Sequence, residues 1–389
     1  MSKSPPMNTA RTGASPAVEW PDPQREVAFR AWLDRIGPAH GLDPGSVRLA
    51  SADASFRRYL RIDSAHGSRI IMDAPPERED SEPFVKVAAL MAQAGLNVPA
   101  VLDWHSESGF LLLQDLGAQT MLEAIDADLP AANQGLYLKA VDALIALQLA
   151  SRPGVLPLYD QALLMRELAL FPDWYLEQHR GVAVRGSLRE TLDRTFELIV
   201  QRNLASPSVY VHRDFMPRNL MMPVGASGTR LGEIAELRLG EIAETRLGNI
   251  AETRLGVLDF QDAVYGPITY DIASLMRDAF LSWDEEFVLD ITVRYWQRAQ
   301  QAGLPVGSDF GEFYRGVEWM GLQRHLKVAG IFARLTLRDG KPRYLADTPR
   351  FIAYIRATAS RYRELTPLLE LIDQAEGTTP TAAYMFGRA

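Results

Sequence analysis

The sequence predicts an α+β fold in two lobes: a small N-terminal sheet lobe with one helix, and a larger, mainly helical C-terminal lobe. Short apolar runs rich in β-branched residues occupy residues 46–117, whereas the pattern after Gly117 is mostly helical. Of the 389 residues, 47% are hydrophobic and 23% are charged, so the chain has the composition and length of a folded protein with one or more sizeable cores. We expect the lobes to join at residues 114–117, with a cleft between them.

The elements of the first lobe follow in order. An amphipathic helix is expected over residues 27–36, ending at Gly37 and Pro38. Extended runs at residues 46–62 and 68–76 flank a Ser-Ala-His-Gly turn and predict strands. A helix follows at residues 83–96, and the segment 98–117 predicts two more strands around a polar turn. Later, short apolar strands are expected near residues 209–222 and 256–263.

The domain boundaries follow from changes in composition. We expect a disordered tail over residues 1–25, an N-terminal lobe over 26–117 and a C-terminal lobe over 118–389. An eight-residue repeat beginning at Arg230 (RLGEIAEL, RLGEIAET, RLGNIAET) interrupts the second lobe. Because each unit carries a glycine and fits neither helix nor strand, we interpret residues 225–255 as an expanded loop without function.

Composition and charge exclude several classes of function. Without cysteine the chain has no disulfide, thiolate nucleophile or cysteine-ligated metal. The net charge of −8 argues against a nucleic-acid or anionic-membrane partner. The first residues lack the apolar run of a signal peptide, and no apolar run approaches the about 20 residues of a spanning helix. We therefore expect a cytoplasmic protein, and a monomer.

Three oxygen-bearing side chains follow two apolar strands of the second lobe. Asp214 and Asn219 lie five residues apart in VYVHRDFMPRNLMM, and Asp259 ends the run GVLD. Amide and carboxylate oxygens suit a hard divalent cation, and a separate carboxylate suits removal of a proton from a hydroxyl. The pattern therefore predicts phosphoryl transfer, with Asn219 and Asp259 as metal ligands and Asp214 as the base.

These motifs resemble the catalytic loop and the Asp-Phe dipeptide of the protein-kinase-like phosphotransferases, in particular the aminoglycoside and choline kinase branch. The matching residues are His212, Asp214, Asn219, Asp259, Phe260 and, in GPITYDIASLM, Asp271. The resemblance implies a bilobal protein-kinase-like fold that uses ATP and Mg²⁺. It also implies that His212 and Asp271 brace the catalytic loop.

The family's strand lysine and helix glutamate are missing, because Met72 and Phe84 stand near their positions. Another cation must then meet the nucleotide phosphates, and we favour Arg57 and Arg58 over Lys86; solvated surface arginines are the alternative. The usual glycine-rich phosphate loop is replaced by SADASF, in which Ser55 offers a hydroxyl donor.

Two further assignments complete the nucleotide and phosphoryl sites. We expect Asp115 and Leu116 to contribute to nucleotide binding at the joint between the lobes. Met216 stands where relatives of the family carry a cation, and Arg218 is the candidate replacement.

The acceptor is inferred from charge and from resemblance. Between Glu318 and Leu345, basic residues stand at 324, 327, 334, 338, 341 and 343 against Glu318 and Asp339, which argues against a polycationic acceptor. Segments such as ADASFRRYLRI, FLLLQDLG and LQRHLKVAGIFARL resemble the sugar kinases of cell-wall (peptidoglycan) recycling that phosphorylate N-acetylmuramate and N-acetylglucosamine at the anomeric C1 hydroxyl. Gln323, Arg324 and Lys327 are the candidate contacts to such an amino sugar. Solvated faces of a C-terminal helix are the alternative for these three.

Two other functions stay open at this point. One is a kinase for a different small hydroxyl acceptor, such as an aminoglycoside, choline or homoserine. The other is a catalytically weak pseudokinase that only binds nucleotide, which the missing lysine and glycines favour and the complete set of Asp214, Asn219 and Asp259 opposes.

Overall fold

The computed structural model describes residues 18–20, 22–52, 57–223 and 254–378. Its α-helices are α1 (Pro23–His40), α2 (Glu82–Gln93), α3 (Met121–Ala124), α4 (Gln134–Leu149), α5 (Gln161–Leu168), α6 (Ser187–Leu204), α7 (Thr269–Met276), α8 (Glu285–Gln301), α9 (Phe310–Leu337), α10 (Thr348–Arg361) and α11 (Thr366–Glu376). Its strands are β1 (Arg48–Ala52), β2 (Arg58–Ser64), β3 (Gly67–Asp73), β4 (Val101–His105), β5 (Phe110–Gln114), β6 (Ser208–Val211), β7 (Leu220–Met221), β8 (Gly256–Val257) and β9 (Val264–Pro267). Two shorter helical segments matter below, the π-helix η3 (Phe171–His179) and the 3₁₀ turn η4 (Pro217–Asn219).

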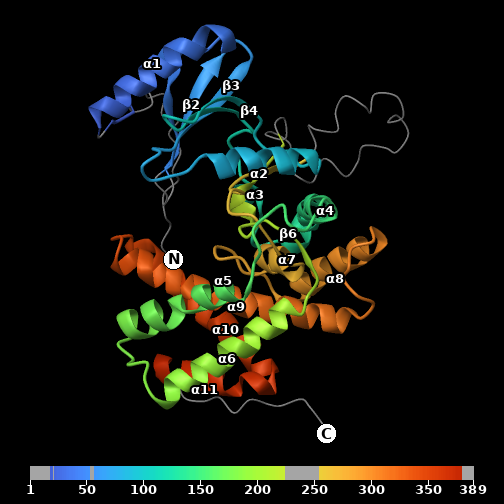
Figure 1. The fold of residues 1–389 in the computed structure, drawn as a ribbon. Helices are drawn as coiled ribbons and strands as arrows, with labels where there is room; N and C mark the ends of the chain where they lie inside the picture. The colour runs from blue at the N-terminus through green and yellow to red at the C-terminus, as the bar shows by residue number, and fades with distance from the viewer. Residues whose placement is uncertain (1–17, 21, 53–56, 224–253, 379–389) are drawn as a thin grey trace, which may run out of the picture. The chain divides into compact units, whose positions relative to one another are not determined.

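The chain divides into two compact units. The first comprises Met1–Ala88 and Pro99–Leu116, and the second comprises Ala89–Val98 and Gly117–Ala389. The first unit holds the strands β1 to β5 and the second is mainly helical, so the predicted α+β class is confirmed (Figure 1).

The first unit is an antiparallel sheet in the strand order β1-β2-β3-β5-β4. The Ser-Ala-His-Gly turn joins β2 to β3 as predicted, with Ser64 opposite Gly67 and a positive φ of 91° at the glycine. Helix α1 lies along the sheet (Figure 1) and buries Phe29 and Trp32 against Phe110 of β5. This aromatic contact forms the centre of the first unit's core.

Helix α1 extends beyond its predicted limits at both ends. It begins at Pro23, inside the predicted tail, because the Asp22 side chain accepts a hydrogen bond from the N–H of Gln24 and caps it. It continues through Gly37 and Pro38 to His40 and ends at Gly41, which has the left-handed φ of 60°. The predicted end at Gly37 was therefore wrong. The loss of one N–H at Pro38 did not stop the last turn.

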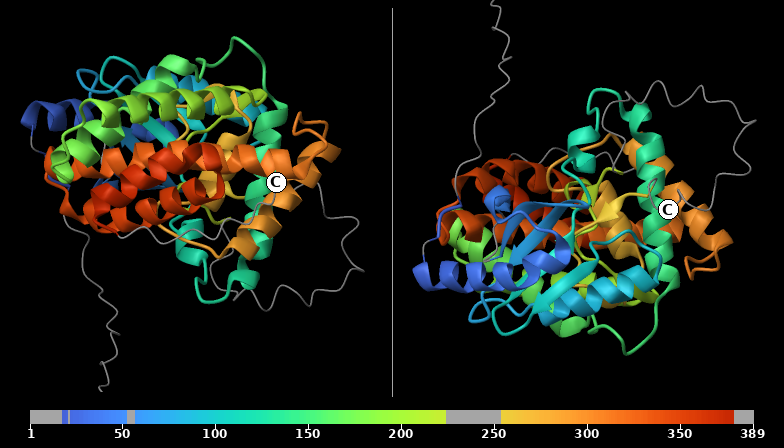
Figure 2. Two further views of the ribbon diagram at one scale, coloured as in Figure 1. Left: turned by 90° about the horizontal axis from the view of Figure 1, so that it is seen from below. Right: turned by 90° about the horizontal axis from the view of Figure 1, so that it is seen from above.

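The second unit is built around the long helix α9. Helices α10, α7 and α6 and the π-helix η3 pack against it (Figures 1 and 2). Gly330 permits the closest of these approaches, since a Cβ atom there would lie 2.3 Å from the carbonyl oxygen of Leu170, just before η3. No helix among the described residues is long and apolar enough to span a membrane.

Two short antiparallel ladders in the second unit carry the predicted site residues. In β6–β9, Val211 pairs with Val264, and in β7–β8, Leu220 pairs with Val257. Residues 212–219, which include Asp214 and Asn219 and are called the catalytic loop below, therefore connect one ladder to the other. The repeat lies outside the described residues.

Candidate active site

The loop between β6 and β7 holds Asp214 and Asn219. The turn η4, started by Pro217, brings Asn219 back so that its amide nitrogen donates to the main-chain oxygen of Asp214 at 2.9 Å. The N–H of Asn219 donates to the carbonyl of Met216, also at 2.9 Å. The five-residue spacing thus closes a tight loop by hydrogen bonds from Asn219 itself.

Asp259 is joined to the same loop across the β7–β8 ladder. The N–H of Leu258 donates to the Asn219 carbonyl at 2.9 Å, and the Asn219 amide nitrogen lies 3.3 Å from Asp259 Oδ2. Gln261 donates to the other carboxylate oxygen at 2.9 Å, and Asp259 has the left-handed φ of 64°. Asn219 therefore contacts both the main-chain oxygen of Asp214 and the carboxylate of Asp259.

Asp271, on the first turn of α7, fixes the start of the loop through hydrogen bonds to its backbone. Its two carboxylate oxygens accept the backbone N–H groups of His212 at 2.6 Å and Arg213 at 3.0 Å. Burial raises the pKa of Asp271 to about 7, against the opposing effect of these N–H donors and of Arg324. Burial also lowers the pKa of His212 to about 4, so its ring is neutral at pH 7. Asp271 thus contacts the backbone at the start of the loop, whereas the His212 contact is made by its backbone N–H and not by its ring.

Arg213, between the brace and the base, has a backbone conformation unusual for its residue type. Its φ is 76°, and it shares with Asp259 the distinction of being a non-glycine residue with positive φ in the described ranges. Its guanidinium forms an ion pair with Glu167 at 2.5 Å and also donates to the carbonyl of Asp262 at 3.4 Å. Sequence spacing did not single out either Arg213 or Glu167.

Arg218 lies on η4, within the same loop. Its guanidinium carbon is 4.7 Å from the ring centroid of Phe280, in the segment that follows α7. Asp278 is buried in that segment. Burial raises its pKa to about 6, and the N–H of Phe280 and the charges of Arg324 and Arg218 act in the opposite direction. Arg218 thus lies near the Phe280 ring and the buried Asp278 carboxylate.

Gln323, Arg324 and Lys327 are buried on α9, with exposures of 0%, 5% and 8%. The alternative that they form a solvated helix face is therefore wrong. Arg324 donates to the main-chain oxygen of Arg213 at 2.7 Å, and its guanidinium lies 4.8 Å from the Tyr270 ring centroid. The hydrogen bonds and ion pairs of these three side chains go to Glu167, Tyr270 and the Arg213 carbonyl, around the catalytic loop.

Glu167, near the end of α5, is the centre of this buried network. It accepts from the Tyr159 hydroxyl at 2.5 Å and from the Gln323 amide at 3.1 Å, and it pairs with Lys327 at 3.1 Å. Burial acts to raise the pKa of Glu167, but Lys327 and Arg213 outweigh it and lower the pKa to about 2. A single carboxylate thus links α5, α9 and the catalytic loop.

In the first unit, both candidate arginines have carboxylate partners. Arg57 pairs with Glu79 at 3.1 Å, and Arg58 pairs with the buried Asp73 at 2.5 Å. Their side chains are 11% and 27% exposed, so they are not solvated surface residues. Lys86 is exposed on α2 and pairs with Glu82 at 2.7 Å, one helical turn away.

The other nucleotide candidates are partly visible. Asp115 forms an ion pair with Arg61 at 2.6 Å, and Leu116 is buried. Ser55 lies outside the described residues. Met72 is fully buried on β3 and Phe84 is buried on α2, which agrees with an apolar exchange of a charged pair.

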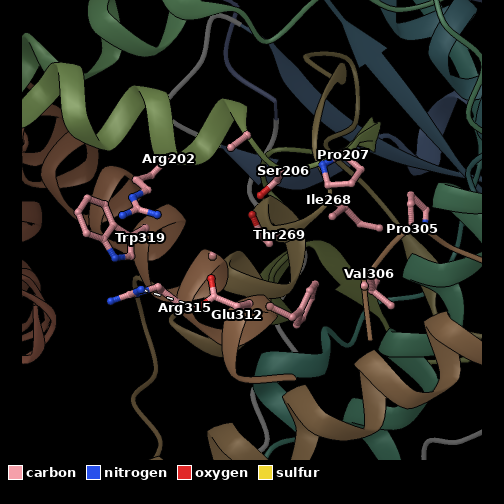
Figure 3. A pocket seen from close by; sticks show the side chains of 14 residues that line it. Arg202, Ser206, Pro207, Ile268, Thr269, Pro305, Val306, Glu312, Arg315 and Trp319 are labelled. Carbon is pink, nitrogen blue, oxygen red and sulfur yellow. Dashed lines mark ion pairs between the residues drawn. The ribbon is translucent and has the colours of Figure 1, made fainter. Parts of the chain in front are cut away.

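A cavity of about 300 Å³ lies elsewhere in the second unit (Figure 3). Pro207 and Ile268, at the start of β6 and the end of β9, form part of its wall, with Arg202, Arg315 and Trp319 at the other end. No predicted site residue lines it. The catalytic loop follows the opposite end of β6, so this cavity is separate from the candidate site.

The donor set fits a magnesium ion that also takes phosphate oxygens. Among the described residues no three His, Cys, Asp or Glu side chains cluster to hold a metal alone. The Asn219 amide group and the Asp259 carboxylate are neighbours, since the amide nitrogen lies 3.3 Å from Asp259 Oδ2. Mg²⁺ commonly binds through one or two such ligands, with substrate phosphates and water completing an octahedron.

Comparison with known proteins gives consistent matches over most of the chain. The model of the phosphotransferase enzyme family matches residues 46–232 and 246–306. A Pseudomonas aeruginosa protein named N-acetylmuramate/N-acetylglucosamine kinase is 46% identical over 358 residues, covering 90% of this chain and 97% of the relative. A Neisseria meningitidis protein of the same name is 44% identical, covering 91% of this chain and 97% of the relative.

The fold is also found among solved structures. The GDP complex of an aminoglycoside 2'-phosphotransferase matches with a TM-score of 0.55 at 14% identity, covering 86% of this chain and 99% of that structure. At this identity the likeness concerns the fold alone, which confirms the predicted protein-kinase-like architecture.

Proposed function

Because the chain belongs to the phosphotransferase enzyme family, we propose that it is an ATP-dependent kinase that phosphorylates the anomeric C1 hydroxyl of N-acetylmuramate and N-acetylglucosamine. The observation that carries the proposal is the closed loop of Asp214, Asn219 and Asp259. The choice of amino sugar is supported by two relatives with that name at 44% and 46% identity.

Asp214 acts as the base in this proposal. Its carboxylate receives the proton of the C1 hydroxyl while that oxygen forms a bond to the γ-phosphorus and the bond from the γ-phosphorus to the β,γ-bridging oxygen breaks. The products are the sugar 1-phosphate and ADP, and the proton leaves from Asp214 to solvent. Arg218, on the same loop, supplies positive charge toward the transferred group.

Asn219 and Asp259 would hold Mg²⁺. The ion, when bound, neutralises charge that develops on the phosphate oxygens. Asn219 supplies its amide oxygen, because its amide nitrogen is already used to close the loop. In the first unit, Arg57, Arg58, Asp115 and Leu116 stay the proposed nucleotide contacts. Their effect is expected on the KM for ATP.

The test is a coupled ADP-release assay over N-acetylmuramate, N-acetylglucosamine, an aminoglycoside, choline and homoserine. We expect turnover with the two sugars, and loss of turnover by at least about a thousandfold in Asp214→Asn, with nucleotide binding retained. Asp193→Asn is the matched control, since Asp193 is exposed on α6 and pairs with Arg189 one turn away.

Each alternative function has its own outcome in this assay. Turnover with choline, homoserine or an aminoglycoside but not with the sugars would replace the proposed acceptor. Nucleotide binding without turnover on any acceptor would favour the pseudokinase. An Asp214→Asn variant with wild-type turnover would remove the base assignment.

A further inference from the structure

We infer that Arg213 is a positioning residue, held in a left-handed backbone conformation by Glu167, Arg324 and Asp271 so that Asp214 is aimed at the acceptor. This inference rests on the proposed kinase function. It concerns residues whose side chains do not themselves take part in the transfer.

The backbone at Arg213 is strained. Its φ of 76° brings the Cβ atom close to the backbone, a conformation that glycine adopts freely and arginine adopts at a cost. Such a conformation persists only where the surroundings enforce it, and it occurs most often at functional sites. Asp214 is the next residue, so the direction of its side chain depends directly on this conformation.

Every polar group of the Arg213 backbone has a partner from a different element. Its N–H donates to Asp271 of α7 at 3.0 Å, and its carbonyl accepts from Arg324 of α9 at 2.7 Å. These two contacts fix the peptide planes on both sides of the residue. The φ and ψ angles of Arg213 are therefore determined by α7 and α9.

The side chain of Arg213 supplies the third restraint. It pairs with Glu167 of α5 at 2.5 Å and donates to the carbonyl of Asp262 at 3.4 Å. Asp262 is three residues after Asp259, so the same guanidinium connects the base loop with the segment that carries the proposed metal ligand. Lys327 and Gln323 hold Glu167 in turn, at 3.1 Å each.

The same contacts give Gln323, Arg324 and Lys327 a role different from acceptor binding. Each is buried and directed to Glu167 or to the Arg213 carbonyl. Loss of Arg324 should then lower kcat for N-acetylmuramate and N-acetylglucosamine equally. N-acetylmuramate differs from N-acetylglucosamine by a lactyl group that carries a carboxylate. A direct contact of Arg324 to that carboxylate would instead raise the KM for N-acetylmuramate alone.

The decisive comparison is Arg213→Ala with Arg213→Gly. Both variants lose the guanidinium, but only alanine keeps the Cβ atom that opposes a positive φ. We expect kcat to fall about ten- to a hundredfold further in Arg213→Ala than in Arg213→Gly, with KM for ATP and sugar within about twofold. If Arg213 served packing alone, glycine would be as damaging as alanine or more so, and that ranking would overturn the inference.

A second comparison removes the ion pair between Glu167 and Arg213 instead of the backbone strain at Arg213. Glu167→Gln should lower kcat about tenfold in the wild-type background but by less than about twofold in the Arg213→Gly background, because the ion pair no longer exists there. Equal losses in both backgrounds would contradict the inference. Glu318→Gln is the matched control: Glu318 is also buried on α9 and paired with arginines, Arg277 at 3.4 Å and Arg361, and its loss should lower stability but not kcat.

The inference and the proposed function fail separately. The variants are ranked with whichever acceptor of the panel the wild-type chain phosphorylates. Turnover with choline but not with sugars would reject the acceptor while the ranking still tests Arg213. A wild-type chain that phosphorylates no acceptor at all would overturn both.

Discussion

Two buried carboxylates near the catalytic loop have opposite shifts in pKa. The difference follows from the charges and donors that surround each carboxylate. Asp271 faces backbone N–H groups, and burial raises its pKa to about 7. Glu167 is buried as well, but the full charges of Lys327 and Arg213 lower its pKa to about 2. At Glu167 the charges of Lys327 and Arg213 outweigh the cost of burial, whereas at Asp271 the two N–H donors and the charge of Arg324 do not.

The shift of Glu167 predicts how stability depends on pH. Because its folded pKa lies below its ordinary value of 4.5, ionised Glu167 adds stability that is fully present above pH 4.5 and is lost as the pH falls toward 2. This lowering of the Glu167 pKa from 4.5 to about 2 corresponds to about 3 kcal/mol of unfolding free energy. Urea unfolding of the wild-type chain and of Glu167→Gln should therefore differ most above pH 5. The difference in unfolding free energy between the two proteins should become smaller between pH 4.5 and pH 3. A difference that grows in acid would contradict the predicted direction of the pH dependence.

At the residue scale, the sequence predicted the groups that lie close along the chain. The five-residue spacing of Asp214 and Asn219 places both on one loop, and Asp271 follows the strand that pairs with β6. Glu167 could not be found in this way, because its partners Arg213 and Gln323 lie 46 and 156 residues away. Such contacts depend on helix packing, which a single sequence does not show.

Among the elements, α9 depends on a close approach at one glycine. Alanine is favoured over glycine inside a helix by about 1 kcal/mol, so a glycine inside the 28-residue helix α9 needs a reason. At Gly330 the reason is the Leu170 carbonyl, which a Cβ atom would meet at 2.3 Å. Backbone atoms cannot move aside as a flexible side chain can.

Gly330→Ala should therefore lower the unfolding free energy by about 1–3 kcal/mol despite the better helix former. Gly321→Ala is the control on the same helix, because its Cβ atom would lie 3.1 Å from the Cδ atom of the Arg277 side chain and not from a backbone atom. We expect the control to change stability by less than about 1 kcal/mol. The measurement is urea unfolding of both variants. Equal effects would show that the helix axis shifts freely.

Element boundaries were predicted less well than element types. The strands β4 and β5 lie within the segment expected from their pattern, and α2 begins one residue before its expected segment. Helix α1, in contrast, passes its predicted end by three residues, to His40. The end of α1 is fixed by Gly41, where a left-handed φ closes the last turn. Both Gly37 with Pro38 and Gly41 are typical of a helix end. The packing of the last turn decides which of them ends the helix, and the sequence does not show that packing.

For the whole molecule, the repeat is an interruption in an otherwise continuous family match. The matched regions end at residue 232 and resume at 246, inside the repeat. The chain is anchored where the described residues resume. Arg254 donates to the Gly95 carbonyl at 2.7 Å, and the N–H of Val257 donates to the Asn97 carbonyl at 2.8 Å. The β7–β8 ladder thus has its own support.

Removing residues 230–253, which joins Thr229 to Arg254, should leave kcat and KM within about twofold of the wild-type values, because loop length changes the closure free energy only slowly. Steady-state kinetics of the shortened chain, alongside a variant lacking one repeat unit, 238–245, test this expectation. A folded but inactive product would show that the repeat has a function.

The distribution of backbone strain has a consequence for engineering this chain. Of the residues that the structure describes, the two non-glycine residues with positive φ, Arg213 and Asp259, both belong to the candidate active site. Replacing such residues with glycine would relieve this strain, because glycine adopts a positive φ freely. Here that route would release the two backbone segments that hold the base and the metal ligand in register. Thermostable variants of this chain should therefore be sought in the helices of the second unit and not by relaxing these two positions.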